Sequence, residues 1–477
     1  MALGRSRASG KITRVQCGRE ACVKTLEQTR GNLIRKIYGN GVVFANLPGQ
    51  RQVPYLPTEK LWALRDARLR RIVRYAAENV PHYRALFQTM KMDPREIRCV
   101  ADLDRMPLLD KSTVCQNPDS FLPTTTLGAK SIPFLTSGST GTRLRIHHDP
   151  RSLLANIAFG EREREVITNL CGRKLGYKEL YLGYPEWTTR KVWDFYESWT
   201  FIPVRPQRLF VSVLEPIEHI AKIINQFRPD VILGWGSYLE LLFRSLALKA
   251  VPIHRPRVLS YGADSMTSAG KRFIEEEFKV AVLSHYSAVE CFKIGFFCER
   301  GMQFHLHEDL CHVKIIDAGG NQLPNGQRGE VVISNLINRG TVLLNYRLGD
   351  IAALTTEKCS CGRNLRLLSE LEGRVEDAVF LPDGTFVHPR MIWSVFKNRN
   401  DILRYQLVQD EPQRFELKIL TPDVHTYMRL IEGILSDLRQ LLGTSAVIQA
   451  RYAEELALPT TRKFRAVQSH CKPALLG

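Results

Sequence analysis

Small hydroxyl residues and glycines are concentrated in one stretch of the chain, Thr136-Ser137-Gly138-Ser139-Thr140-Gly141-Thr142. Strand-like runs flank it, the apolar Ile132 to Leu135 before and Arg143 to Ile146 after. Glycine lets a backbone approach a ligand closely, consecutive N–H groups can enclose an anion, and hydroxyls add donors. The stretch therefore favours a phosphate-binding loop, with a flexible turn as the competing interpretation. It is not a Walker loop, because no Gly-Lys-Ser or Gly-Lys-Thr follows.

Further stretches combine glycine with carboxylate, aromatic or basic residues. They are Tyr261-Gly262-Ala263-Asp264, His285-Tyr286-Ser287-Ala288-Val289-Glu290, Asn345-Tyr346-Arg347-Leu348-Gly349-Asp350, Gly373-Arg374-Val375-Glu376-Asp377 and Thr460-Thr461-Arg462-Lys463-Phe464-Arg465. Taken singly, each is weak evidence. The competing interpretation of Asp350 and Arg374 is that they are capping and surface residues, and a lysine in a basic tail, such as Lys463, is usually solvated. Glu290 ends an expected strand, where ligand sites collect in α/β sheets.

Apolar periodicity predicts alternating helices and strands in the middle of the chain. Helices are expected at Ile217 to Ile224, Tyr238 to Leu246 and Lys271 to Phe278, and strands at Val231 to Leu233, Val258 to Ser260 and Val280 to Ser284. This alternation is typical of a parallel α/β sheet with covering helices. The fold class is therefore α/β.

The pattern changes beyond Cys311. Strand-like runs at His312 to Asp317 and Glu330 to Asn335, separated by a Pro-Asn-Gly turn, indicate a small β-rich subdomain. The last hundred residues predict a separate small α+β unit. Its expected elements are strands at Arg404 to Val408 and Phe415 to Leu420, a helix from Tyr427 to Leu438, and a strand from Ala446 to Tyr452.

Composition limits the function classes. With 477 residues the chain is long enough for two to four domains, and its 44% hydrophobic content is sufficient for full cores. No apolar run approaches the ~18 residues of a membrane-spanning helix. No apolar segment follows the basic N-terminus, so we expect no signal peptide and a cytoplasmic location.

The net charge of +18 raises the question of a nucleic-acid partner. The basic residues are scattered and no aromatic-basic RNA motif is present, so we expect none. A basic surface would also attract a polyanionic small substrate such as ATP or coenzyme A. Eleven cysteines without a secretory context do not favour a disulfide framework.

We call the stretch Thr136 to Thr142 the hydroxyl loop. In their order and spacing, this loop and the later stretches resemble the adenylate-forming enzymes, most closely the phenylacetate–CoA ligase branch, over about residues 60–470. The resemblance implies a large N-terminal AMP-binding domain at 61–372, after a weakly patterned extension at 1–60. It also implies a small, mobile α+β domain at 373–477 behind a hinge at 374–377. Relatives in this branch suggest a homodimer, although the sequence leaves the oligomeric state open.

The resemblance further implies a two-step reaction that uses ATP, Mg²⁺ and coenzyme A. A carboxylate attacks the α-phosphate of ATP, giving an acyl-adenylate and pyrophosphate. The thiol of coenzyme A then displaces AMP and forms a thioester. Charge crowding around phosphate dominates the barrier, so the protein must supply positioning and positive potential.

The resemblance assigns roles to individual residues. Ser137 to Thr142 would hold the β and γ phosphates, Glu290 would help to hold Mg²⁺, and Lys463 would neutralise the α-phosphate and the carboxylate during adenylation. Asp350 would accept hydrogen bonds from the ribose hydroxyls, and Arg374 would lie near the ribose. Tyr286 beside Ser287 would stack on adenine, Gly262, Ala263 and Asp264 would line the adenine slot, and Glu376 would mark the hinge.

Several positions depart from the family pattern: Val289 and Leu348 lack expected hydroxyls, Arg462 and Arg143 stand where Gly and Pro are common, and Glu376 replaces the hinge Asp. Each lost hydroxyl bond would cost ~1 kcal/mol. The departures leave room for an acceptor other than coenzyme A, namely an amine, a hydroxyl or a carrier protein as in polysaccharide biosynthesis. They also leave room for a catalytically inactive scaffold.

The acid is not readable from the sequence, and an aromatic acid is an expectation from the family alone. The candidate wall residues are Trp235, Gly236, Tyr238, Tyr261 and His285.

A second kind of site is indicated by Cys298, His305, Cys359 and Cys361. Two sulfurs one residue apart can share a metal ion, and three cysteines with one histidine form an ordinary structural zinc set. The same stretches resemble zinc-carrying members of the phenylacetate–CoA ligase branch, which implies a structural zinc ion. The alternative is a group of buried, reduced cysteines without metal.

Overall fold

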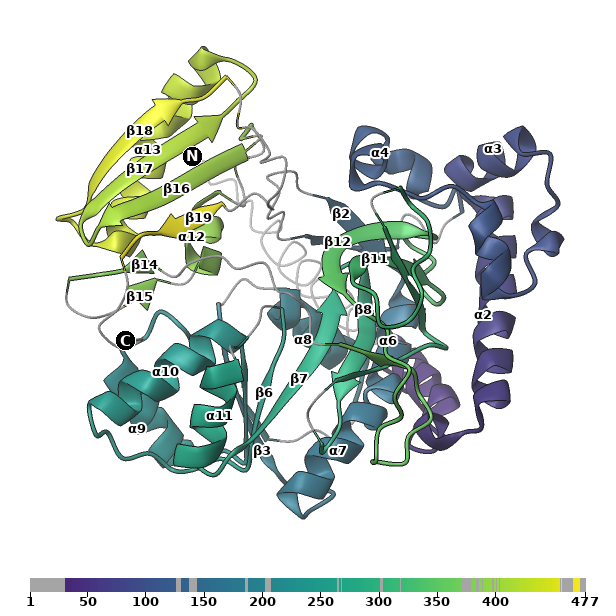
Figure 1. Ribbon diagram of the computed structural model, residues 1–477, viewed down its shortest axis with the longest axis horizontal. Helices are drawn as coiled ribbons and strands as arrows, with labels where there is room; N and C mark the ends of the chain where they lie inside the picture. Colours follow the sequence, from purple (N-terminus) through teal and green to yellow (C-terminus); the bar gives the residue numbers. More distant parts are fainter. Residues whose placement is uncertain are drawn as a thin grey trace, which may run out of the picture.

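An eight-stranded mixed sheet forms the centre of the fold (Figure 1). Its strands follow the order β13 (Leu367–Leu368), β9 (Phe304–Leu306), β8 (Cys291–Phe297), β7 (Ala281–Ala288), β6 (Val258–Tyr261), β5 (Val231–Gly234), β3 (Lys178–Gly183) and β4 (Gln207–Ser212). Strands β3 to β7 pair in parallel, whereas β8, β9 and β13 are antiparallel additions at one edge. The predicted α/β class with a parallel sheet is confirmed.

The computed structural model describes most of the chain. The described residues are 31–125, 130–136, 144–184, 188–201, 207–263, 266, 268–300, 303–317, 319–369, 379–382, 386–387, 389–396, 399, 401–402, 404–454, 456 and 466–471.

The crossover helices of the parallel part are α9 (Ile217–Phe227), α10 (Gly236–Leu248) and α11 (Ser268–Glu277). Each lies close to its predicted range. Strands β5 and β6 are apolar along most of their length and largely buried, because a parallel strand between helical layers has no solvated face. Strand β7 extends beyond its predicted end and includes Tyr286 and Ser287.

A three-stranded antiparallel sheet lies beside the central one, with the order β10 (Cys311–Ile316), β11 (Gly329–Asn335) and β12 (Tyr346–Ala352). It corresponds to the predicted β-rich subdomain. The connector before the hydroxyl loop docks on it, since Leu109 donates to the carbonyl of Asn345 at 2.9 Å and accepts from the amide of Arg347 at 3.0 Å. A further pair, β1 (Ile132–Leu135) and β2 (Arg145–His148), is antiparallel and flanks the hydroxyl loop.

The C-terminal unit contains a four-stranded sheet in the order β18 (Val447–Tyr452), β17 (Arg414–Leu420), β16 (Arg404–Glu411) and β19 (Val467–Ser469). Helix α13 (Val424–Leu442) connects β17 to β18, as the sequence predicted, and α12 (Pro389–Phe396) precedes the sheet. The unit stands at one side of the central body in Figure 1. The hinge residues Arg374 to Asp377 lie outside the described part of the chain, so the domain division stays a prediction.

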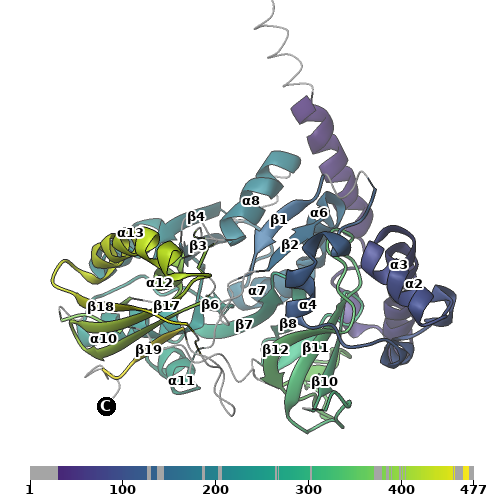
Figure 2. The ribbon, with the colours of Figure 1, turned by 90° about the horizontal axis from the view of Figure 1, so that it is seen from above.

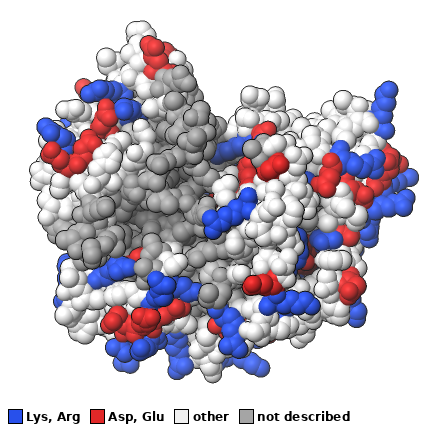
Figure 3. Space-filling view, in the orientation of Figure 1, with Lys and Arg blue, Asp and Glu red and all other residues white. Residues whose placement is uncertain are grey.

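Helices α2 (Thr58–Asn79) and α3 (Pro81–Thr89) cover the opposite side. Pro81 ends one helix and starts the next, because a proline lacks the N–H that a helix interior requires but fits the first turn. Residues 31–46 are also helical, an element that the weak patterning of the first 60 residues did not predict. On the face drawn in Figure 3, lysines and arginines are interspersed with acidic residues over the described part.

A buried ion network joins these layers at α7 (Glu161–Cys171). Arg162 and Asp309 have no exposed surface and form two hydrogen bonds, of 2.6 and 2.9 Å. Arg68 of α2 adds a third contact to Asp309 at 2.7 Å, and Gln50 accepts from Arg162. Burial alone would raise the pKa of Asp309, but the adjacent guanidinium of Arg162 outweighs it and holds that pKa below its usual range.

The ion pair generates a stability prediction. Asp309→Asn should lower the free energy of unfolding by about 3–5 kcal/mol, because Arg162 would keep its charge without a buried counter-ion. The folded pKa of Asp309 is depressed, so its contribution is complete above the unfolded value near about 4 and is lost as the pH falls below it. Urea unfolding at pH 7 measures the effect.

Glu96→Gln is the matched control, since Glu96 pairs with Arg105 at 2.6 Å on the exposed surface. This variant should unfold almost like the wild type. An Asp309→Asn effect no larger than that of the control would contradict the importance of the network.

Candidate functional site

The predicted nucleotide site is partly described. The loop residues Ser137, Gly138, Ser139, Thr140, Gly141 and Thr142, together with Asp264, Arg374, Glu376 and Lys463, lie outside the described residues. The remaining predicted residues are Gly262, Ala263, Tyr286, Ser287, Glu290 and Asp350.

Tyr286 and Asp350 contact each other directly. The hydroxyl of Tyr286, on β7, donates to Oδ2 of Asp350, on β12, at 2.8 Å. The tyrosine ring is buried and packs on Phe304 with 5.7 Å between ring centroids. The bond links the central sheet to the three-stranded sheet and orients a carboxylate that is only partly buried.

Glu290 lies in the turn between β7 and β8, close to the same strand β12. Tyr346, at the start of β12, donates to its carboxylate at 3.4 Å, and Nδ2 of Asn335 donates to its carbonyl at 2.9 Å. The Glu290 side chain is 8% exposed. Strand β12 is therefore linked to both carboxylates of the predicted site, since it contains Asp350 and since its residue Tyr346 contacts Glu290.

His148 fixes the turn of Glu290 from the other side, a role that the sequence did not predict. Nε2 of this buried histidine donates to the carbonyl of Val289 at 2.7 Å. Burial lowers the pKa of His148 to about 4, so the ring is neutral at pH 7. The only sequence signal was its position at the end of the strand that leaves the hydroxyl loop.

The segment after β11 is hydrogen-bonded to the end of β2 and to the residue that follows it. Nδ2 of Asn338 donates to the carbonyl of His147 at 2.9 Å, and the amide of Arg339 donates to the carboxylate of Asp149 at 2.9 Å. Asp149 also caps the N-terminus of α6 (Pro150–Phe159). Strand β2 is therefore bonded to the segment after β11, and Asn335 at the end of β11 is the residue that bonds the Glu290 carbonyl.

The predicted adenine slot lies where β6 ends. The amide of Gly262 donates to the carbonyl of Gly234 at 3.3 Å, and any Cβ on Gly262 would overlap the ring of His285. Ala263 adopts a left-handed conformation with φ of 69°, which is uncommon for a residue with a side chain. A tight turn of this kind brings backbone groups to the carboxyl end of the sheet, the usual ligand edge of α/β proteins.

The candidate wall residues are at this same edge. Trp235 follows β5, Tyr261 ends β6 and His285 is on β7, three neighbouring strands. Trp235, Tyr238 and Tyr261 are almost completely buried. Burial lowers the pKa of His285, which makes it a neutral wall at pH 7.

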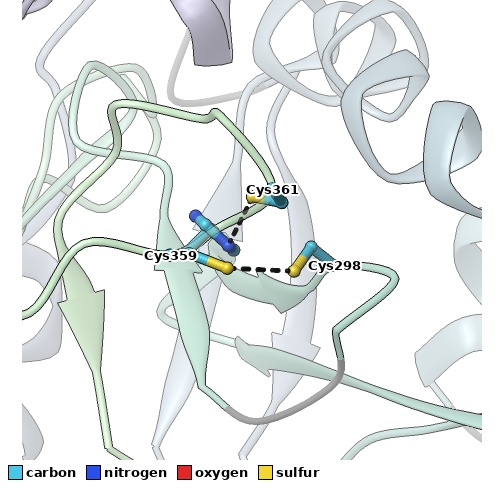
Figure 4. A group of neighbouring side chains, drawn as sticks. Cys298, Cys359 and Cys361 are labelled. Atoms are coloured by element: carbon cyan, nitrogen blue, oxygen red, sulfur yellow. Dashed lines mark hydrogen bonds between the residues drawn. The ribbon is translucent and has the colours of Figure 1, made fainter.

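The four predicted metal ligands are gathered in one cluster (Figure 4). Cys298 follows β8, His305 lies on β9, and Cys359 and Cys361 belong to the loop between β12 and β13. Their ligand atoms lie within 4.8 Å of one another, with 3.6 Å between the sulfurs of Cys298 and Cys359 and 3.5 Å between Sγ of Cys361 and Nε2 of His305. A tetrahedral zinc site requires about 3.8 Å between sulfurs and about 3.5 Å between sulfur and nitrogen, so the donor set fits this ion.

Arg363 anchors the loop that carries two of these cysteines. Its guanidinium is buried and pairs with Glu299 at 2.7 Å and with Glu165 of α7 at 3.2 Å. Two sulfurs and this ion pair attach the loop to the edge of the central sheet. Burial raises the pKa of Cys298 to about 12, and a bound cation would be needed to remove its proton.

No helix in the described part of the chain has the length and apolar character needed to cross a membrane.

Comparison with known proteins supports the expected resemblance. No protein-family model matches the chain. This chain is 28% identical over 378 residues to the phenylacetate-coenzyme A ligase of Thermus thermophilus, and the match covers 75% of this chain and 80% of the relative. It is 23% identical over 410 residues to the enzyme of the same name from Aromatoleum evansii, covering 82% and 90%.

The fold is shared with a solved structure of 2-hydroxyisobutyryl-CoA ligase in complex with 2-HIB-AMP and CoA in the thioesterification state. The TM-score is 0.59 at 16% identity, covering 89% of this chain and 92% of that one. The expected resemblance to phenylacetate–CoA ligases is thus confirmed by sequence, and the fold is that of a solved CoA ligase.

The His148 contact generates a pH prediction. The folded pKa of about 4 lies below the unfolded value of about 6.5, so the unfolded chain binds the extra proton and stability falls as the pH drops through this window. His148→Gln keeps a donor for the Val289 carbonyl and cannot be protonated. Relative to the wild type, the variant should lose about 2 kcal/mol less between pH 7.5 and pH 5, measured by urea unfolding.

His219→Gln serves as the control, because His219 is exposed and pairs with Glu215 on the surface. Parallel pH profiles for His148→Gln and the wild type would show that the buried ring does not titrate as inferred.

Proposed function

We propose that this protein is an ATP-dependent acid–thiol ligase that activates a carboxylic acid as an acyl-adenylate and transfers the acyl group to coenzyme A. The observation that carries the proposal is the convergence of β12 and the β7–β8 turn, where Tyr286 orients Asp350 and Tyr346 contacts Glu290. The sequence relatives named phenylacetate-coenzyme A ligase and the shared fold support the same reaction.

The two carboxylates have distinct roles in this proposal. Asp350 accepts hydrogen bonds from the two ribose hydroxyls, and its geometry is set in advance by the bond from Tyr286. Glu290 lies in a turn held by His148 and Asn335, and it would hold Mg²⁺, a cation that prefers carboxylate oxygen together with phosphate. Such preorganisation matters because charge develops on the phosphates during the reaction.

The chemistry takes place in two displacements. A substrate carboxylate oxygen bonds to the α-phosphorus as the bond to the β-phosphate oxygen breaks, releasing pyrophosphate. The thiolate of coenzyme A then attacks the acyl carbonyl, and AMP leaves. We assign to Ser137–Thr142 the binding of the β and γ phosphates, to Arg374 a contact near the ribose, and to Lys463 the neutralisation of charge at the α-phosphate. We further propose that the unit 373–477 turns about 374–377 between the two steps.

An aryl acid is the proposed substrate class. The sequence relatives are named for phenylacetate, and the wall candidates Trp235, Tyr238 and Tyr261 are aromatic. Aromatic walls favour a flat apolar acid over a charged one.

We also propose a structural zinc ion at Cys298, His305, Cys359 and Cys361. The support is the distances among the four donor atoms and the absence of these residues from the proposed reaction centre. When bound, the ion would neutralise the thiolates and attach the loop at 355–363 to β9.

ATP–pyrophosphate exchange over a panel of carboxylic acids tests the reaction. Exchange is expected with at least one aryl acid. Lys463→Ala should reduce its rate by roughly 100-fold, and Asp350→Ala should raise the KM for ATP by roughly tenfold or more through lost charge-assisted hydrogen bonds. Tyr286→Phe should have a smaller effect of the same kind, because it removes only the group that orients Asp350.

The exposed variant His219→Gln should exchange like the wild type. Exchange without thioester formation would indicate a different acceptor. No exchange with any acid and no ATP binding would favour a scaffold and contradict the ligase proposal.

Metal content tests the zinc proposal independently of activity. Mass spectrometry of the purified protein should find one zinc ion per chain. Cys359→Ser should lose most of it and unfold at lower temperature, since binding free energy is also folding free energy. Cys471→Ser, outside the cluster, should keep the ion. A wild-type protein that binds no zinc when refolded with it would overturn the proposal.

A further inference from the structure

The helical stretch 31–46 packs one face against the rest of the protein, and its opposite face is exposed to solvent. In Figure 2 this purple helix projects from the body beside α6. Its position is not accidental, because specific contacts fix one side of it.

The inner face carries the attachment. A Cβ on Gly39 would overlap the carbonyl oxygen of Trp199, so the helix approaches α8 (Thr188–Trp199) as closely as a glycine allows. Val42 and Val43 are buried, and Val42 packs in a core cluster with Leu154. These contacts determine which side of the helix faces outward.

The outer face is apolar. At 100° per residue, its members fall within an arc of about 140°. They are Leu33, Ile34, Ile37, Tyr38, Gly41, Phe44 and Ala45, and none is charged. Five of them are large, and their exposed fractions range from 48% for Tyr38 to 59% for Ile37 and Phe44. We call these seven residues the apolar face.

The helix contacts a neighbouring segment that ends α8. Phe201, which follows α8, is 51% exposed, and Nζ of Lys36 lies 5.3 Å from the centre of its ring. Arg35 lies 5.7 Å from the ring of Trp199, which in turn contacts Tyr38. An exposed face made of several large apolar side chains is typical of an interaction site.

The charge around the apolar face indicates the partner. Residues 1–36 contain nine lysines and arginines but only two glutamates, and the chain as a whole carries +18. Arg35 and Lys36 lie on the other side of the same helix, beside the rings of Trp199 and Phe201. A helix with one apolar face, basic residues on its other side and aromatic residues at its edge is the type that lies in a lipid interface. Anionic headgroups attract basic segments next to such a helix.

We propose that the apolar face docks on a membrane surface that carries anionic lipid headgroups. The helix would lie in the plane of the interface, with Ile37 and Phe44 toward the acyl chains and Arg35 and Lys36 toward the headgroups. Docking would hold the central body next to the membrane. The proposed nucleotide site, at the edge of the central sheet, would take no part in it. The proposal does not depend on the ligase reaction.

Co-sedimentation of the full chain with vesicles tests the proposal. Vesicles of phosphatidylcholine alone are compared with vesicles that contain phosphatidylglycerol in addition. The wild type should bind the anionic vesicles, and added salt should weaken the binding. The double variant Ile37→Glu/Phe44→Glu should reduce the partition coefficient by roughly tenfold or more, because it places two charges in the interface.

Leu248→Glu and Met428→Glu are matched controls, since both residues are exposed apolar side chains, at 69% and 65%, on other elements. Both should bind vesicles like the wild type. The double variant should show an unchanged thermal unfolding curve, because it alters an exposed surface.

Three results would overturn the proposal. The wild type could fail to bind anionic vesicles, or the double variant could bind as the wild type does. Alternatively, analytical ultracentrifugation could show self-association that the double variant abolishes, without vesicle binding, in which case the apolar face would serve a second copy of the chain.

Discussion

The structure depends on charges that are paired, fully or partly out of solvent, around α7. Its first five residues alternate in sign, and four of them pair with four different parts of the chain. The pairs are Glu161 with Arg51, Arg162 with Asp309, Glu163 with Lys293 and His307, and Glu165 with Arg363. A charge removed from water is tolerated only when its partner is in place. One helical turn therefore specifies how the N-terminal region, the central sheet and the cysteine loop fit together.

The stretch His305 to Asp309 is the main partner of that turn, and its residues divide the work. His305 enters the cysteine cluster, His307 contacts Glu163, Glu308 pairs with Arg366, and Asp309 pairs with Arg162. Strand β9 has only three residues, too few to be held by its ladder alone. The cluster and the ion pairs act as one support for this sheet edge, and neighbouring β7 and β8 carry the turn of Glu290.

Much of this arrangement could be predicted from the sequence, and there are physical reasons why the rest could not. The strands and crossover helices followed from apolar periodicity, and Cys298, His305, Cys359 and Cys361 are indeed neighbours in space. The bonds of His148 and Asn335 to the turn of Glu290 escaped because they use backbone carbonyls, which leave no mark in the sequence. The charged turn of α7 has the pattern of a solvated surface, and only tertiary structure shows that Arg162 is buried and its charged neighbours are half-buried against partners.

The helix at 31–46 shows the same limit in reverse, since apolar residues are expected inside and here they face outward. Gln50, shortly after this helix, accepts two hydrogen bonds from the buried guanidinium of Arg162. Rotating the helix to hide Ile37 and Phe44 would break these bonds and would also force Trp199 away from Gly39. The outward apolar face thus follows from the contacts of Gly39 and Val42 on the opposite side, and a partner that covers it would be held next to α6 and α8.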